Sequence, residues 1–270
     1  MSVRQYRPKF NSRKGIGTPA KFWLTIFLLT LIALQISYPL VKSEALRWVT
    51  IATVIIGALF VYIDAHVNFG PRFANLLAFT TILYAFLVEA LGQKTQWPFG
   101  EYKYSPTLGL QMLQVPLIVP FAWLLMSYPV LIVARRTTNS WVFLVGGFGL
   151  AAWDLFLDPQ MVAAGRWSWV LKGAHVPFEK SIPLSNLFGW LLSGMLLMGL
   201  LNLLLPKERK KKTERTKHVE VLLIWTLFAG VIGNIFFFHQ PGVALIGGLA
   251  FFIFLARYFY IMFLGIPELN

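Results

Sequence analysis

The sequence predicts an all-α polytopic membrane protein, a single bundle of about eight transmembrane helices, with seven as the alternative count. Of the 270 residues, 57% are hydrophobic and 13% are charged, and the mean hydropathy is +0.65. Soluble domains carry about 25% charged residues. Several stretches of about 18 or more residues carry almost no charge, which is the length that crosses a bilayer as a helix. Apolar runs of this length exclude a transmembrane β-barrel, whose strands are shorter.

The apolar runs divide the chain into one membrane domain with short polar ends. We expect a basic segment at 1–21, a transmembrane domain at 22–264 that contains a basic loop at 206–218, and a tail at 265–270. The first apolar run is long and no small-residue cleavage site follows it, which favours a retained helix over a signal peptide. The expected spans are 22–41, 45–63, 73–91, 110–134, 141–157, 183–205, 219–238 and 243–264.

Lysine and arginine gather in two places, the N-terminal segment and the loop KERKKKTERTK at 207–217. Short cytoplasmic loops carry an excess of these residues, so both chain termini are expected in the cytoplasm of a bacterial or archaeal cell, with the protein in the plasma membrane. Basic blocks beside apolar helices are typical of topology signals, so we expect lipid and no nucleic acid as a partner. The chain has no cysteine, and we expect neither a metal nor a cofactor.

Two of the expected helices have unusual residues. The fourth contains Pro116, Pro120 and Pro129, which predicts a kink and a cavity beside it. The fifth contains GGFGLAA, whose small residues allow another helix to approach closely. Farther along it, Asp154 and Asp158 continue the helix face that carries these small residues. That face must meet protein or a cavity, because a carboxylate facing lipid costs several kcal/mol.

Polar and aromatic residues converge at the non-cytoplasmic end of the expected bundle. Glu89 ends the third helix, the loop QWPFGEYKYS follows it, and GRWSW and PLSNLFGW follow the acidic helix. The catalytic candidates are Glu89, Asp154 and Asp158. The substrate-binding candidates are Trp97, Glu101, Tyr102, Tyr104, Trp167, Trp169, Asn186 and Trp190.

Ordinary structural roles are open for several of these residues. The tryptophans and tyrosines could form an aromatic belt at the lipid surface. Asp158 precedes Pro159 and could simply end a helix, and Glu101 could pair with Lys103 or Arg166. Asp154 and Glu89 are harder to explain in this way, because both lie inside apolar runs.

Three blocks between Glu89 and Leu192 resemble a known family: EALGQKTQWPFGEYKYSPTLGLQMLQVPLIVPFAW, AAWDLFLDPQMVAAGRWSW and IPLSNLFGWLL. The chain resembles the integral-membrane carotenoid biosynthesis proteins typified by bisanhydrobacterioruberin hydratase and the related carotene 1',2'-hydratases. The resemblance implies hydration of the terminal double bond of an acyclic carotenoid end group. The product is a tertiary alcohol that a glycosyltransferase can modify.

Hydration of such an alkene needs a protonated acid, an electron-rich surface for the cation and groups that hold one water. Our hypothesis from the sequence makes Asp154 the proton donor, with Asp158 or Glu89 as its charge partner. Asn186 and Glu101 are the expected water-holding groups. Tryptophan and tyrosine faces would stabilise the cation. The expected substrate is an apolar polyene that enters from lipid.

Four other functions are open from the sequence. A carotene cyclase begins with the same protonation. A membrane prenyltransferase could use the D-x-x-x-D pair of Asp154 and Asp158 to hold Mg²⁺. A proton-coupled transporter also uses buried acids. A scaffold for other carotenoid enzymes needs no chemistry of its own.

Overall fold

The computed structural model describes residues 18–206 and 217–264. The expected basic segment at 1–21, basic loop at 206–218 and tail at 265–270 therefore lie almost entirely outside the described residues. Within these ranges, eight helices are long and apolar enough to cross a membrane, which confirms the predicted fold class. They are α1 Thr18–Ser37, α2 Ser43–Phe69, α3 Pro71–Thr95, α4 Val119–Thr137, α5 Val142–Ala163, α6 Leu184–Leu204, α7 Lys217–Ile232 and α8 Pro241–Leu264.

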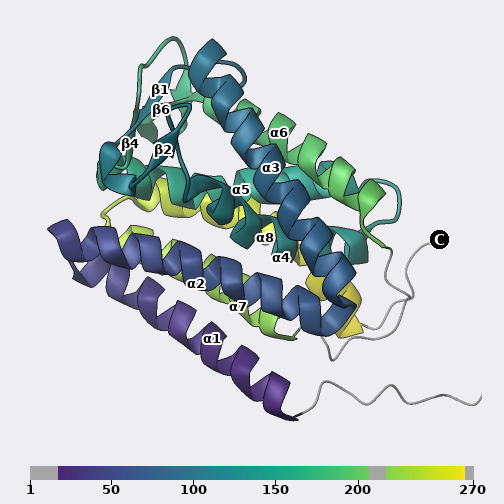
Figure 1. The fold of residues 1–270 in the computed structure, drawn as a ribbon. Coiled ribbons are helices and arrows are strands. Elements are labelled where there is room, and N and C mark those ends of the chain that lie inside the picture. The colour runs from purple at the N-terminus through teal and green to yellow at the C-terminus, as the bar shows by residue number, and fades with distance from the viewer. Residues whose placement is uncertain (1–17, 207–216, 265–270) are drawn as a thin grey trace, which may run out of the picture.

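Helices α4 and α5 form the centre of the bundle (Figure 1). In their most apolar windows 78% and 67% of the residues are buried, against 17% to 44% in the other six helices. Helices α3 and α6 lie on one side of this pair, and α1, α2 and α7 lie on the other (Figure 1). The residues that touch both central helices are therefore in the most protected part of the protein.

Glycines bring α5 and α6 into close contact. A Cβ atom added at Gly147 would lie 2.7 Å from the backbone nitrogen of Met195, and one at Gly194 would lie 3.1 Å from Gly147 Cα. Larger side chains at these positions would push the helices apart. This close approach, expected from GGFGLAA, places the carboxylates of α5 next to the first turn of α6.

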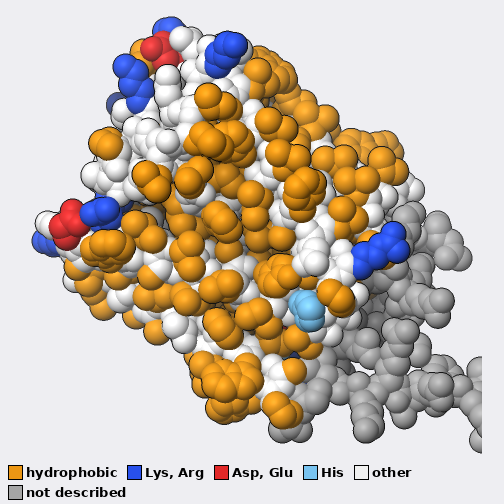
Figure 2. Space-filling model, in the orientation of Figure 1, with side chains coloured by type: hydrophobic (Ala, Val, Ile, Leu, Met, Phe, Trp, Pro, Cys, Tyr) orange, Lys and Arg blue, Asp and Glu red, His pale blue; other side chains and the backbone are white. Residues whose placement is uncertain are grey.

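The outer surface has the character of a membrane protein. Figure 2 shows hydrophobic side chains across the middle of one face, with basic and acidic side chains toward its left and upper left and basic and histidine side chains toward its right. Exposed apolar residues include Phe79, Leu203 and Phe236. An apolar band between two charged ends is the arrangement that a bilayer requires.

The fourth helix begins later than the sequence predicted. Residues 111–112 and 115–116 pair as the short strands β2 (Gln111–Met112) and β3 (Val115–Pro116), and α4 starts at Val119 instead of residue 110. Pro116 has no N–H group and disfavours helix in the residue before it. Pro120 lies in the first turn of α4, where its missing N–H costs nothing, so only Pro129 lies inside the helix.

The fifth helix ends later than predicted. It continues to Ala163 instead of stopping at residue 157, and Pro159 lies inside it. Asp158 therefore does not end the helix, and that interpretation of the residue is wrong. Pro159 removes one backbone donor, which the rest of the helix tolerates. Asp154 and Asp158 thus stand one turn apart on one rigid element.

The loops between helices contain three two-stranded sheets that the sequence did not predict. Besides β2 and β3, strand β1 (Tyr102–Tyr104) pairs with β4 (Trp167–Trp169), and β5 (His175–Val176) pairs with β6 (Glu179–Pro183), all antiparallel. The 3₁₀ turn η2 (Pro106–Leu108) lies between β1 and β2, and η1 (Tyr38–Leu40) lies in the connection between α1 and α2. We call this end of the bundle the hairpin end. The labelled strands gather there in Figure 1.

The opposite end is held by two arginines of α4. Arg135 donates hydrogen bonds to the carbonyl oxygens of Leu201, Leu205 and Pro206 at 3.3, 3.1 and 3.1 Å. Leu201 O also accepts from the Leu205 N–H at 2.9 Å, whereas the carbonyls of Leu205 and Pro206 lie at and beyond the C-cap of α6, where helix carbonyls lack an intrahelical donor. Arg136 contacts Glu220 of α7 at 3.2 Å. Side chains of α4 therefore tie α6 and α7 to the centre of the bundle.

Candidate functional site

The strand pair β1–β4 forms an aromatic wall at the hairpin end. Tyr102 lies opposite Trp169 and Tyr104 lies opposite Trp167 in the register. The ring centroids are 4.8 Å apart in the first pair and 5.7 Å apart in the second. Alternate residues of a strand share a face, so all four rings gather on one side of the pair. Two loops that are distant in the sequence thus make one surface.

Glu89 of α3 lies against this wall and is only 3% exposed. Its Oε2 accepts hydrogen bonds from the hydroxyls of Tyr102 at 2.5 Å and Tyr104 at 2.9 Å, and its Oε1 accepts one from Trp123 Nε1 at 3.0 Å. Burial, followed by the charge of Glu89, raises the pKa of both tyrosines well above the usual value. Both phenols therefore keep their protons and act as donors.

Asp154 and Asp158 share one amide donor. Asn186 of α6 donates through Nδ2 to Asp154 Oδ2 at 3.3 Å and to Asp158 Oδ2 at 2.5 Å, and Trp167 Nε1 donates to Asp158 Oδ1. Each of the two carboxylates is 2% exposed and Asn186 is 1% exposed. Among the described residues, Asp154 Oδ1 and Asn186 Oδ1 have no hydrogen-bond partner. The pair is buried together with acceptor atoms that a water or a proton could satisfy.

These groups surround one cavity of about 60 Å³ between α3, α4, α5, α6 and the aromatic wall. We call it the acid cavity. Its polar lining is Glu89, Asp158 and Asn186, and Trp123 stacks on Trp190 at 4.3 Å along its side. Asp154 does not line it. That residue lies on the other side of the Asp158 and Asn186 side chains, beside a space of about 10 Å³ that Glu179 also lines.

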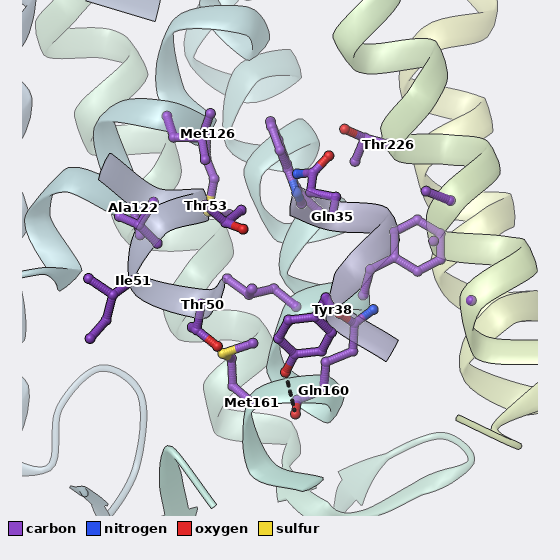
Figure 3. Close-up of a pocket in the computed structure, with 18 of the residues that line it drawn as sticks. Gln35, Tyr38, Thr50, Ile51, Thr53, Ala122, Met126, Gln160, Met161 and Thr226 are labelled. Atoms are coloured by element: carbon purple, nitrogen blue, oxygen red, sulfur yellow. Dashed lines mark hydrogen bonds between the residues drawn. The ribbon is translucent and has the colours of Figure 1, made fainter. Parts of the chain in front are cut away.

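A larger cavity of about 210 Å³ adjoins the acid cavity on the side of α1, α2 and α7 (Figure 3). We call it the apolar cavity. Five residues line both spaces: Val119, Ala122, Met126, Leu157 and Trp167. The two cavities therefore meet along the N-terminal turns of α4 and beside Leu157 in the last turns of α5.

The structure brings most of the sequence candidates together. Eight of them line the acid cavity: Glu89, Tyr102, Tyr104, Asp158, Trp167, Trp169, Asn186 and Trp190. Asp154 reaches the same group through Asn186.

Two candidates lie elsewhere. Trp97 is 55% exposed. Glu101 forms a salt bridge with Lys172 at 2.7 Å, instead of with Lys103 or Arg166, and its side chain is 29% exposed. The hydrogen bond and the charge of Lys172 lower the pKa of Glu101. Neither residue lines a cavity described above.

Sequence reasoning missed two residues of the site and one buried acid outside it. Trp123 donates a hydrogen bond to Glu89 and stacks on Trp190. In the sequence it is a single tryptophan in an apolar helix near Pro120, and nothing else there indicates a role in the site. Phe99 lines the acid cavity from the loop before β1. Asp64 of α2 is a further buried acid, 2.6 Å from the Tyr128 hydroxyl, but it lies toward the other end of its helix.

No group of three histidine, cysteine, aspartate or glutamate side chains that could hold a metal ion is present among the described residues. The carboxylate oxygens of Glu89 and Asp158 accept hydrogen bonds from tyrosine, tryptophan and asparagine donors. The chemistry that the cavity offers directly is proton transfer beside aromatic faces.

Comparison with known proteins places the chain in a family. The family model described as carotenoid biosynthesis protein matches residues 17–260. The bisanhydrobacterioruberin hydratase of Haloarcula japonica is 34% identical over 130 residues, which cover 46% of this chain and 43% of that protein. The match thus spans less than half the length of that curated relative, and no solved structure matches. With nearly the whole described chain matched by the family model, the protein belongs to the carotenoid biosynthesis protein family.

Proposed function

We propose that this protein is an enzyme of the plasma membrane that hydrates the terminal double bond of an acyclic carotenoid end group. The observation that carries the proposal is the acid cavity itself, where buried carboxylates and aromatic rings surround one small space. The relative that is named a hydratase supports the reaction class. The substrates are an apolar polyene and water.

The reaction begins with proton transfer to the less substituted carbon of the double bond. Asp158 faces the cavity and supplies this proton, because its carboxylate is the member of the aspartate pair that lines the space. Protonation leaves a tertiary cation on the neighbouring carbon. A positioned general acid of this kind contributes about 10²–10⁴-fold to the rate.

Asp154 acts as the charge partner of Asp158 rather than as the donor expected from the sequence. The Asn186 amide contacts both carboxylates, so the two lie within reach of one group. Two carboxylates in such a position hold one proton between them, which keeps the donor loaded. The assignment of the two roles follows from which carboxylate lines the acid cavity.

The aromatic rings and Glu89 stabilise the cation. The stacked pair Trp123 and Trp190 and the ring of Trp169 line the same space. Each aromatic face attracts a cation by about 0.5–2 kcal/mol, with the larger value in a dry site. Glu89 accepts three hydrogen bonds, which hold a negative charge in place beside the cation.

Water then completes the reaction. A water that donates a hydrogen bond to Asn186 Oδ1, which has no partner among the described residues, would lie beside the cationic carbon. Its oxygen bonds to that carbon, and the proton that it loses returns to the aspartate pair. One water is added to the double bond, and the acid is regenerated.

The test is a reaction of the purified protein in nanodiscs with an acyclic carotene, followed by mass spectrometry. The proposal predicts a product that is heavier by one water, with the hydroxyl in the terminal isoprene unit. A product of unchanged mass with a ring would make the protein a cyclase. Unchanged substrate, with the protein shown to be folded, would contradict both assignments.

A further inference from the structure

The apolar cavity is larger than the acid cavity and has different walls. It occupies about 210 Å³ between α1, α2, α4, α5 and α7, and the labelled side chains point into it from several helices (Figure 3). The wall on the side of α7 contains small residues, among them Ala229 and Gly230. A Cβ atom added at Gly230 would lie only 2.8 Å from the ring of Phe156. Gly230 therefore leaves room for the Phe156 ring, which itself lines the cavity.

The polar residues around this cavity mostly use their polar atoms elsewhere. Gln35 Oε1 accepts a hydrogen bond from Trp225 Nε1 at 2.7 Å. The Thr50 and Thr226 hydroxyls donate to carbonyl oxygens of their own helices at 2.7 and 2.8 Å. None of the described residues that line the space is charged. The cavity therefore offers an occupant mainly hydrocarbon and aromatic surface. Thr53 Oγ1 is buried at this cavity without a hydrogen-bond partner.

The two cavities share the wall made by Val119, Ala122 and Met126 of α4 and by Leu157 of α5. An acyclic end group in the acid cavity is continuous with a long polyene, which must leave that cavity at some point. The apolar cavity adjoins the acid cavity along these four residues, so a chain that passes between their side chains would enter it. A polyene with its end beside Asp158 would thus place its following isoprene units against α2 and α7.

We infer that the apolar cavity binds the linear polyene behind the reacting end, and that its shape selects for a long chain without rings. This inference rests on the proposed function. Lipid is as apolar as the cavity, so leaving the bilayer gives the substrate no hydrophobic gain. Binding there depends on close packing along the chain, and packing discriminates by shape.

The test fills the cavity from two opposite walls. Ala229→Trp on α7 and Thr53→Trp on α2 each place an indole in the space, far from the carboxylates. Ala33→Trp is the matched control, because Ala33 is exposed on the lipid-facing side of α1. Each variant is assayed in nanodiscs with a long acyclic carotene and with a short acyclic monoterpene that has the same isopropylidene end.

We expect Ala229→Trp and Thr53→Trp to raise KM for the long substrate by about tenfold or more, because overpacking a filled space costs that much. The kcat/KM for the monoterpene should stay within about twofold in both variants, and the control should match the wild type on both substrates. Equal losses on the two substrates, or no loss on either, would overturn the inference.

A binding measurement separates this inference from the proposed reaction. The absorption spectrum of a long polyene shifts when it leaves lipid for a protein site, whether or not a reaction follows. If the wild-type protein binds the polyene without hydrating it, and both cavity-filling variants lose the shift, the proposed reaction fails but the polyene site stands. A phospholipid acyl chain that the polyene does not displace from the wild-type protein would overturn the site.

Discussion

Replacing Asp158 with asparagine tests the assignment of the proton donor. The substitution keeps the size of the side chain and removes the acidic proton. Two donors surround the carboxylate, Asn186 Nδ2 at 2.5 Å and Trp167 Nε1. The new amide can keep its oxygen toward Trp167 and turn its nitrogen toward Asn186. The Asn186 side chain can then rotate by half a turn and accept through Oδ1, which lacks a partner among the described residues. This rotation takes Nδ2 away from Asp154 Oδ2, so Asp154 must hold a proton and donate it to the same Oδ1.

The folded state should therefore tolerate Asp158→Asn. A buried polar group left without a partner costs about 1–3 kcal/mol, and the rotation of Asn186 avoids most of that cost. Loss of the general acid lowers kcat by about 10²–10⁴-fold, which corresponds to about 3–5 kcal/mol in the activation free energy. The damage should fall on kcat and leave polyene binding nearly unchanged.

The assay follows product formation by mass spectrometry in nanodiscs, with thermal unfolding as the control for folding. Asp154→Asn is the comparison variant, because Asp154 does not line the acid cavity, and it should lose less activity than Asp158→Asn. A folded Asp158→Asn protein that retains activity within threefold of the wild type would show that Asp158 is not the proton donor. A larger loss in Asp154→Asn would return the donor role to Asp154.

Three further predictions follow from the contacts around the site and at the opposite end. Glu89→Gln can keep its amide oxygen toward Trp123 Nε1, but its N–H groups then meet the hydroxyls of Tyr102 and Tyr104, which donate to Glu89 and would have to turn their protons away. We therefore expect a loss of about 1–3 kcal/mol in unfolding free energy together with lower activity, measured by denaturation and turnover. Arg135→Ala removes the guanidinium donors from the carbonyls of Leu205 and Pro206 at the end of α6, which should lower the thermal midpoint while kcat below that temperature stays unchanged. Glu101→Gln breaks only an exposed ion pair with Lys172, so activity within twofold of the wild type is expected, and a large loss would restore Glu101 to the site.

The sequence was sufficient to predict the features that depend on local composition. Eight apolar runs became eight helices, with the ends of α4 and α5 displaced where prolines misled the boundaries. The helix face from Gly147 to Asp158 also meets protein, as its helical spacing predicted. Its glycine brings α6 close, and its carboxylates meet Asn186. Helical periodicity and the cost of a carboxylate in lipid carry this information without any knowledge of the fold.

Features that depend on pairing between distant segments were not predictable. The register that sets Tyr102 opposite Trp169 joins two loops, and single-sequence patterns do not show which loops pair. Trp123 gained its role because α4 crosses beside Glu89. The choice of the proton donor between Asp154 and Asp158 likewise depends on which of them lines the acid cavity. The packing of α5 against α6 determines this, and the sequence does not show it.

The most direct test of the central claim is the reaction of the purified protein with an acyclic carotene in water enriched in heavy oxygen. We predict a tertiary alcohol in the terminal isoprene unit that carries the heavy oxygen and that disappears in Asp158→Asn. A product without the label, whether a cyclised pigment of unchanged mass or an alcohol whose oxygen comes from another source, would contradict this prediction.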